Sequence, residues 1–383
     1  MKNIFTILFS LLAFAITGGC QGQENGGLST KDKNLNHIDS LLKDWNNRDL
    51  FHGGIVISHE GEIVYENYLG FADRTWNIPV TSDVKFDIAS LNKSMTAALI
   101  MKAVEEGKLD LEDKLSDVLT SFSFNGSFDK QITIHQLLCH TSGLGDYNQV
   151  GADLKAKQSL KLKRLRFTNA EYVDFISKLP TVAAPGTQFH YSNFAYHLLA
   201  IILEETYQMS FRQILKEKLT QPLGLSNTLS ADNNEQIIAK LATGYQYDDQ
   251  KEEWMENSFI DLSLGRRIFS TAADLNRWAL VMDNPGYLSK NSLQLIKKNH
   301  LEGISDQLQY GYGWVIVEPG KESKMGNLDI NQSYIIHGGR TEGYKSMLIN
   351  IANGEWVISF LSNVGDRTNE MEIAKQIAHI IIN

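Results

Sequence analysis

The sequence is poor in cysteine and proline, and it has no excess of positive charge. Its 383 residues include 2 cysteines and 6 prolines. Two cysteines are too few for a disulfide framework or a cysteine-rich zinc site, and the scarcity of proline excludes long proline-rich linkers. The 36 Lys and Arg residues are outnumbered by 45 Asp and Glu residues, which gives a formal net charge of −9. A nucleic-acid-binding protein needs a basic surface to meet phosphates, so we expect no nucleic-acid partner.

Several catalytic signatures are also missing. The sequence contains no G-x-S-x-G elbow, no H-E-x-x-H motif and no Walker-type phosphate loop, so it gives no support to an α/β-hydrolase, a zincin or a nucleotide-binding enzyme. His135 and His140 lie five positions apart. We expect them to serve in the core or in a turn rather than to bind a metal, and we expect neither a metal nor another cofactor.

The N-terminus is typical of an export signal. Lys2 precedes an apolar run of 13 residues, 4–16, which is too short to cross a bilayer of ~30 Å as a helix. The small residues 17–19 and Cys20 follow, and this arrangement resembles a bacterial lipoprotein signal, in which the cysteine becomes the lipidated first residue. We therefore expect residues 1–20 to be an export signal and residues 21–34 to be a flexible tether. The protein would be exported and anchored to the membrane through a lipid on Cys20, facing the periplasm or the cell surface; simple cleavage and secretion is the alternative.

Strand patterns lie at both ends of the remaining chain, and helix patterns lie between them. Alternating or β-branched runs predict strands at 54–58, 62–68, 310–317, 333–337, 344–351 and 356–361. Apolar residues at helical spacing predict helices at 34–48, 90–106, 133–139, 169–178, 191–207, 210–219, 271–282 and 370–382. One antiparallel sheet built from both chain ends, flanked by helices and with an all-helical lobe inserted, satisfies this order. The predicted fold class is therefore α/β of the α+β kind.

A serine followed by a lysine one helical turn later is a known nucleophile arrangement, because the two side chains share a helix face. The pattern S-x-x-K occurs four times, at Ser40, Ser82, Ser90 and Ser127. Ser40 lies in an amphipathic helix pattern and Ser82 and Ser127 lie in polar segments, whereas Ser90 lies where an apolar helix begins. A helix start offers unpaired backbone N–H groups that could hold an oxyanion.

Lys93 would lie one turn inside that helix among apolar neighbours, which should lower its pKa and let it accept the Ser90 proton. The alternative is that Ser90 only caps the helix and that Lys93 is solvated.

Further segments then follow in an order that resembles one family. Besides residues 86–93 (FDIASLNK), the segments are 54–73, 132–144 (ITIHQLLCHTSGL), 185–193 (PGTQFHYSN), 221–225 (QPLGL), 268–278 (IFSTAADLNRW) and 337–344 (HGGRTEGY). They resemble the serine β-lactamase and penicillin-binding protein superfamily, in its class C β-lactamase-like and DD-peptidase-like branch.

The resemblance covers residues 35–383. It implies a β-lactamase/transpeptidase-like catalytic domain, with a sheet lobe at about 35–88 and 255–383 and a helical lobe at about 89–254.

The resemblance implies a role for each matched residue. Ser90 is similar to the nucleophile that forms an acyl-enzyme, and Lys93 to its proton-accepting partner. Tyr191 matches the tyrosine that carries a proton to the leaving group and later activates water, for which its pKa would have to fall beside Lys93. Asn193 matches the amide that orients the lysine and the substrate.

The last motif, on a strand, departs from the class C pattern. His337 stands where those β-lactamases carry the lysine of Lys-Thr-Gly, and a histidine is charged at neutral pH only if its pKa is raised. Gly338 and Gly339 would let a substrate lie along the strand edge. The backbone N–H groups of Ser90 and Arg340 would form the oxyanion hole, and the Arg340 side chain could supply a carboxylate-binding charge instead of His337.

Two basic features lie outside these motifs. Arg266 and Arg267 replace the small residues expected before residue 268, and they would line the cleft or, as we favour, face solvent. Residues 155–166 contain six Lys and Arg residues, which would form a lid or an anion-attracting patch, or more simply a solvated surface.

These patterns predict an exported serine hydrolase. It would act through a Ser90 acyl-enzyme on an amide, a D-amino-acid peptide or an ester in the cell envelope, with peptidoglycan fragments among its small-molecule or peptide substrates. It would be of the DD-carboxypeptidase, D-peptidase or esterase type, with weak β-lactamase activity as a further option and efficient β-lactamase activity as the less favoured one. The alternative is a catalytically silent envelope lipoprotein that uses the same cleft to bind a partner.

Overall fold

The structure is a computed structural model that describes residues 30–123, 126, 129–150, 168–231, 236–256, 266–341 and 343–382. The predicted export signal with Cys20, most of the predicted tether and the basic segment 155–166 lie outside these residues.

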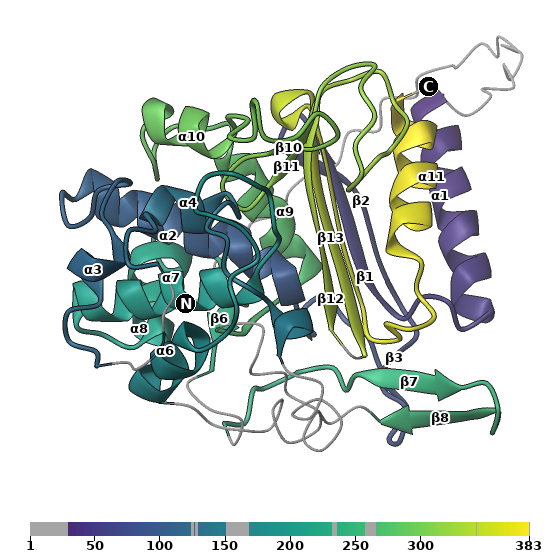
Figure 1. The fold of residues 1–383 in the computed structure, drawn as a ribbon. Helices are drawn as coiled ribbons and strands as arrows, with labels where there is room; N and C mark the ends of the chain where they lie inside the picture. The colour runs from purple at the N-terminus through teal and green to yellow at the C-terminus, as the bar shows by residue number, and fades with distance from the viewer. Residues whose placement is uncertain are drawn as a thin grey trace, which may run out of the picture.

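A seven-stranded antiparallel sheet forms the centre of the molecule, in the order β10-β11-β12-β13-β14-β1-β2 (Figure 1). Its strands come from both ends of the chain, because β1 pairs with β14 as well as with β2. The strands are β1 (Gly53–His59), β2 (Glu62–Leu69), β10 (Gln309–Tyr310), β11 (Val315–Val317), β12 (Tyr334–Thr341), β13 (Tyr344–Ile351) and β14 (Trp356–Ser362). The predicted antiparallel sheet is confirmed.

The predicted strand 310–317 was wrong, because residues 311–314 turn the chain and divide it into the short strands β10 and β11. The turn requires glycine at two positions, Gly311 and Gly313. A Cβ on Gly311 would lie 2.0 Å from the Ile296 carbonyl oxygen, and Gly313 has a φ of +74°. A Cβ on Gly313 would come within 2.8 Å of the Lys93 backbone, so the turn packs directly on the helix that carries Lys93.

Two helices cover the outer face of the sheet. α1 (Thr30–Asn47) begins four residues before the predicted start, and it lies beside α11 (Glu370–Ile382) (Figure 1). Ile38 and Ile373 from these helices share one core cluster with Ile55 and Phe360 of the sheet. Val56, the next residue along β1, points to the opposite face and belongs to the second cluster, as the period of two in a strand requires.

Helices from the middle of the chain pack beside the sheet around one central helix. α9 (Ala272–Val281) lies against β14 and β1, and α2 (Asn92–Glu105) packs on α7 (Asn193–Tyr207). Almost every residue of α2 is buried, which is why its apolar residues surround it rather than forming a stripe. The other α-helices of the described residues are α3 (Leu115–Val118), α4 (Ile134–Leu138), α6 (Asn169–Ser177), α8 (Phe211–Leu215) with a π turn (Lys216–Thr220), and α10 (Lys290–Ile296).

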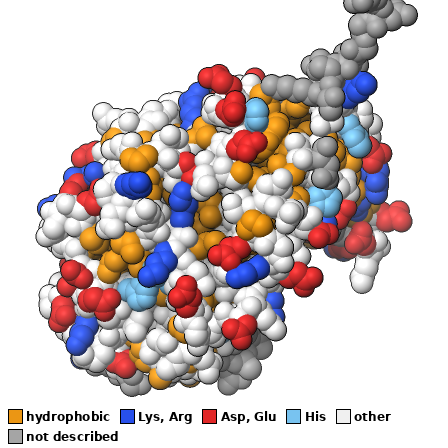
Figure 2. Space-filling model, turned by 90° about the horizontal axis from the view of Figure 1, so that it is seen from above, with side chains coloured by type: hydrophobic (Ala, Val, Ile, Leu, Met, Phe, Trp, Pro, Cys, Tyr) orange, Lys and Arg blue, Asp and Glu red, His pale blue; other side chains and the backbone are white. Residues whose placement is uncertain are grey.

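Short elements that the sequence did not predict complete the fold. β5 (Phe86–Asp87) and β6 (Leu229–Ser230) flank β9 (Ile268–Ser270), whereas β3 (Phe71–Asp73) pairs with β4 (Ile78–Pro79) and β7 (Tyr245–Asp248) with β8 (Glu253–Glu256). The sheet of β5, β9 and β6 holds the chain immediately before the predicted nucleophile. On the face seen from above, the described basic and acidic side chains are interspersed (Figure 2).

Candidate active site

Ser90 lies in a single 3-10 turn, η1 (Ala89–Leu91), between β5 and α2. The turn is held in an unusual backbone conformation, because Ala89 has a φ of +49°, a region that residues with a side chain rarely occupy. The Ala89 N–H donates to Asp87 Oδ1 over 2.8 Å. A carboxylate outside the predicted motif roles therefore fixes the turn that presents Ser90.

Asp87 is itself held by Arg267, and this corrects the expectation that residues 266 and 267 face solvent. Arg267 Nε donates to Asp87 Oδ2 over 2.6 Å, and both side chains are largely buried. Arg266 pairs with Glu204 over 2.6 Å, also out of the cleft. Both arginines point into the protein because carboxylates more than 60 positions away in the sequence lie within reach, which no local pattern could indicate.

Lys93 is fully buried and lies between two predicted catalytic side chains. Its Nζ donates to Ser90 Oγ over 3.1 Å and to Asn193 Oδ1 over 2.8 Å. Burial lowers the pKa of Lys93 to about 7, because water no longer solvates the charged amine, while the charge of Asp146 acts in the opposite direction. The predicted lowering of this pKa is confirmed, and a large fraction of Lys93 is neutral at physiological pH.

Asn193 is the first residue of α7 and is oriented by a second carboxylate outside the predicted motif roles. Its Nδ2 donates to Asp146 Oδ2 over 3.0 Å, and its backbone N–H donates to Asp146 Oδ1 over 3.1 Å. With Nδ2 committed to Asp146, Oδ1 is directed at Lys93. The sequence offered only one hint of this role, the position of Asp146 just after the matched segment 132–144.

Tyr191 directly precedes the N-cap of α7, so it lies outside the helix that was predicted to begin with it. Its ring lies over Lys93, with Nζ 4.9 Å from the ring centroid. The expectation that its pKa falls was wrong for the free enzyme. Burial raises the pKa of Tyr191 above its usual range, and this outweighs the opposite effect of a hydrogen bond with Ser90. The resting tyrosine is therefore protonated.

His337 is buried on β12 and is neutral. Its Nδ1 lies 2.7 Å from the Gly338 carbonyl oxygen, which can only accept, so Nδ1 carries the proton. Its Nε2 then accepts from the Tyr310 hydroxyl over 3.3 Å. Burial and the nearby Lys93 lower the pKa of His337 to about 3. It therefore supplies no positive charge at neutral pH.

The residues after His337 form an open strand edge beside Ser90. β11 pairs with β12 only as far as Ile336, so no described strand covers the outer side of residues 337–341. Gly339 is sterically required there, since a Cβ would lie 2.3 Å from the Ile88 carbonyl oxygen, whereas at Gly338 it would meet only Met347 at 3.4 Å. The oxyanion hole of Ser90 and Arg340 N–H groups stays a prediction.

A cleft of about 370 Å³ contains these groups. Ser90, Tyr191, His337 and residues 338–340 line it, together with a floor of apolar side chains, Val315, Met325, Ile336, Met347 and Met371. Lys324, Arg340 and Glu370 are its charged residues, and Glu370 pairs with Lys345. The structure therefore brings together all the predicted site residues that it describes, and Cys20 lies outside the described residues.

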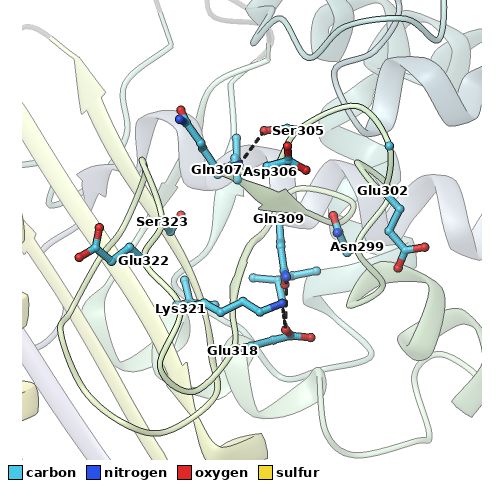
Figure 3. A pocket seen from close by; sticks show the side chains of 14 residues that line it. Asn299, Glu302, Ser305, Asp306, Gln307, Gln309, Glu318, Lys321, Glu322 and Ser323 are labelled. Atoms are coloured by element: carbon cyan, nitrogen blue, oxygen red, sulfur yellow. Dashed lines mark hydrogen bonds and ion pairs between the residues drawn. The ribbon is translucent and has the colours of Figure 1, made fainter.

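A second cavity of about 410 Å³ is lined by residues from 299 to 309, by β11 and by the loop that follows it (Figure 3). Its lining is polar and includes an ion pair between Lys321 and Glu318 at 2.7 Å, to which Gln309 adds a hydrogen bond of 3.3 Å. It contains none of the predicted catalytic residues, so the cleft is the candidate active site.

The described residues hold no group of three or more His, Cys, Asp or Glu side chains arranged to bind a metal ion. His140 is buried, and its Nδ1 accepts from the Ser192 N–H over 3.1 Å. His135 makes a 2.8 Å hydrogen bond with Tyr312. Within the described part of the chain, no helix has the length and apolar character needed to cross a membrane.

The fold is that of beta-lactamases and transpeptidases, and its cleft places Ser90 3.1 Å from the amine of the buried Lys93. A profile of the beta-lactamase family matches residues 43–381, so the chain belongs to the beta-lactamase family, whose members are serine hydrolases.

Two relatives and one solved structure are similar to this chain. Penicillin-binding protein 4* of Bacillus subtilis is 28% identical over 366 residues, covering 92% of this chain and 77% of the relative. Protein flp of Staphylococcus aureus is 23% identical, and this chain spans 65% of its length, slightly under two thirds. The crystal structure of a penicillin-binding protein from Bacillus halodurans is 24% identical and superposes with a TM-score of 0.73 over 90% of this chain and 99% of the other.

Proposed function

We propose that the protein is an exported serine hydrolase that forms an acyl-enzyme at Ser90 and acts on an amide, a D-amino-acid peptide or an ester in the cell envelope. One observation carries this proposal. The fully buried Lys93 lies 3.1 Å from Ser90 Oγ and has a pKa of about 7, so the nucleophile has a neutral base within hydrogen-bond distance.

This geometry supports the following acylation step. Ser90 Oγ attacks the carbonyl carbon while its proton moves to Lys93, and the N–H groups of Ser90 and Arg340 stabilise the oxyanion. When the carbon–nitrogen or carbon–oxygen bond breaks, Tyr191 gives its proton to the leaving group and recovers one from Lys93. A tyrosine that burial keeps protonated is suited to this transfer. Water then hydrolyses the acyl-enzyme by the reverse sequence.

The cleft favours substrates with an apolar part and a negative charge near the scissile bond. Its floor is apolar, and among the described residues neither Lys324 nor Arg340 has an ion-pair partner. Because His337 is neutral, these two residues are the cations available to a substrate carboxylate. The neutral His337, at the position where class C β-lactamases carry a lysine, supports a carboxypeptidase, D-peptidase or esterase type over an efficient β-lactamase.

The intact mass of the purified protein after mixing with a penicillin tests the proposal, with Ser90→Ala as the control. A stable added mass in the wild type alone would support slow-deacylating, penicillin-binding peptidase chemistry. Loss of the β-lactam ring without an adduct would indicate a working β-lactamase. If neither occurs, D-peptides and short esters are assayed next, and inertness toward all of them would favour a silent binding protein over an enzyme.

Membrane anchoring through Cys20 is tested separately. Cells that express the protein are grown with a palmitate analogue that can be tagged, beside a Cys20→Ala variant. Label on the wild type alone supports the lipid anchor. An unlabelled wild-type protein recovered from the medium supports cleavage and secretion instead.

A further inference from the structure

His140 is bound to the chain on both sides of Tyr191. The His190 N–H donates to the His140 carbonyl oxygen over 2.8 Å, and the Ser192 N–H donates to His140 Nδ1 over 3.1 Å. One residue thus accepts both N–H groups that flank the predicted proton-transferring tyrosine, one with its backbone and one with its ring.

The rest of the same loop holds the residues that follow. Ser192 Oγ donates to the Gly145 carbonyl oxygen over 3.0 Å. The Asp146 carboxylate accepts from the backbone N–H and from the side-chain Nδ2 of Asn193. The loop 140–146 therefore holds residues 190, 192 and 193, and His140 binds the N–H groups immediately before and after Tyr191.

The His140 imidazole is buried among aromatic rings, and its burial destabilises the fold. It is fully buried, and its ring centroid lies 4.4 Å from that of Tyr191 and 5.2 Å from that of Tyr310. Since Nδ1 accepts a hydrogen bond, the neutral ring carries its proton on Nε2, and that buried nitrogen has no hydrogen-bond partner among the residues that the structure describes. A buried donor without a partner destabilises a protein and calls for an explanation.

We propose that His140 is a positioning residue for the acylation reaction, which holds Tyr191 in line with Lys93 and Ser90 through its carbonyl oxygen and Nδ1. The inference rests on the proposed function. If this hold were lost, the Tyr191 ring, now 4.9 Å from Lys93 Nζ, would shift and admit water to the amine.

Water would then reduce the desolvation that lowers the Lys93 pKa, so the pKa would rise. The groups that face Lys93 in this environment are Ser90, Asp146, Tyr191, Asn193, Tyr196, His140 and His337.

The backbone at residue 140 provides a matched pair of variants. His140 has a φ of +59°, a conformation that Asn and Gly both tolerate. His140→Asn keeps an acceptor, because its Oδ1 comes close to the former position of Nδ1. His140→Gly keeps the backbone carbonyl and loses the side-chain acceptor. Comparing the two separates the Ser192 hydrogen bond from backbone strain.

The experiment measures the rate of Ser90 acylation by a chromogenic ester from pH 5 to 9, normalised to the number of sites that a fluorophosphonate titrates. We expect His140→Gly to lower the rate by about 100-fold, as misplacement of a reacting group by ~1 Å does. The acid limb of its pH–rate profile, where the rate rises as Lys93 loses its proton, should move to higher pH. His140→Asn should stay within about fivefold of the wild type, with an unmoved limb. Thermal melting of each variant records stability separately.

Two outcomes overturn the inference alone, provided that the wild type is acylated. One is a His140→Gly variant with the wild-type rate and acid limb. The other is equal slowing of both variants with an unmoved limb, which assigns His140 to packing. A wild-type protein that no probe acylates at any pH overturns the proposed function and this inference together.

Discussion

Gly339 of β12 lies so close to Ile88 that a Cβ atom on Gly339 would come within 2.3 Å of the Ile88 carbonyl oxygen. Ser346 on the neighbouring strand donates to that same oxygen over 2.7 Å. The strand edge where a substrate would lie and the turn that carries Ser90 are therefore in direct contact. Their separation sets the space between the nucleophile and the substrate backbone.

Replacing Gly339 by alanine should disturb this contact. Because the added methyl group would meet backbone and a buried hydroxyl, we expect Gly339→Ala to lose about 1–3 kcal/mol of stability and most Ser90 acylation. Gly338→Ala is the matched stability control, since its Cβ would meet only the end of Met347 at 3.4 Å. Thermal melting of both variants checks this, and equal melting temperatures would contradict the steric explanation.

The ion pair of Asp87 and Arg267 should be important for stability because it is buried. Asp87→Asn leaves the Arg267 charge without its partner, so we expect a loss of about 3–5 kcal/mol in urea unfolding. Adding Arg267→Met should recover much of it. The exposed pair of Arg48 and Asp44, at 3.0 Å, gives the control, where Arg48→Ala should cost less than about 1 kcal/mol. An Asp87→Asn variant as stable as the wild type would contradict the prediction.

The rate of acylation should follow the ionisation of Lys93. The amine accepts the Ser90 proton only when neutral, so the rate should rise with pH through about 7 and then level off. The Asp146 charge raises the pKa of Lys93, so Asp146→Asn should lower that pKa and move the acid limb to lower pH. Stopped-flow measurement of the acylation rate across pH locates the acid limb in the wild type and in Asp146→Asn. The exposed Asp44→Asn variant is the control. A limb that moves to higher pH in Asp146→Asn would show that the sign is wrong.

Arg340 should distinguish substrates by charge if it binds a carboxylate. We expect Arg340→Ala to lower kcat/KM about tenfold for a substrate with a free carboxylate, through the loss of a charged hydrogen bond. The same substrate with an amide cap should be much less affected. Lys321→Ala, in the second cavity, provides the charge-matched control. Equal losses on both substrates would point to the backbone of residue 340 instead of its side chain.

The local parts of the fold could be predicted from the sequence, and the contacts between distant segments could not. The hairpin of β1 and β2 and the strands β13 and β14 follow from alternation and turn residues close in sequence. The break between β10 and β11 depends on Gly313 packing against Lys93, some 220 positions away, which no window of sequence reports.

In the candidate site, too, some residues could be predicted from the sequence and others could not. Ser90, Lys93, Tyr191, Asn193 and His337 stand in recognisable motifs. Ser90, Tyr191 and His337 line one cleft, and Lys93 joins Ser90 to Asn193 by hydrogen bonds, although the catalytic roles of all five stay predictions. Asp87, Asp146 and Arg267, which orient these residues, carry no motif role of their own. The pKa of Tyr191 could not be predicted, because it depends on burial, which belongs to the assembled fold and not to residue type.

The position of β1 between β2 and β14 has a consequence for synthesis. Gly53 pairs with Ser362 and His59 with Trp356, so a nascent chain carries every matched catalytic residue before the sheet can close. Closing such a long loop is slow, since most of the chain must be ordered for few contacts. We therefore expect a chain ending before β14 to contain Ser90, Lys93 and His337 without a working site.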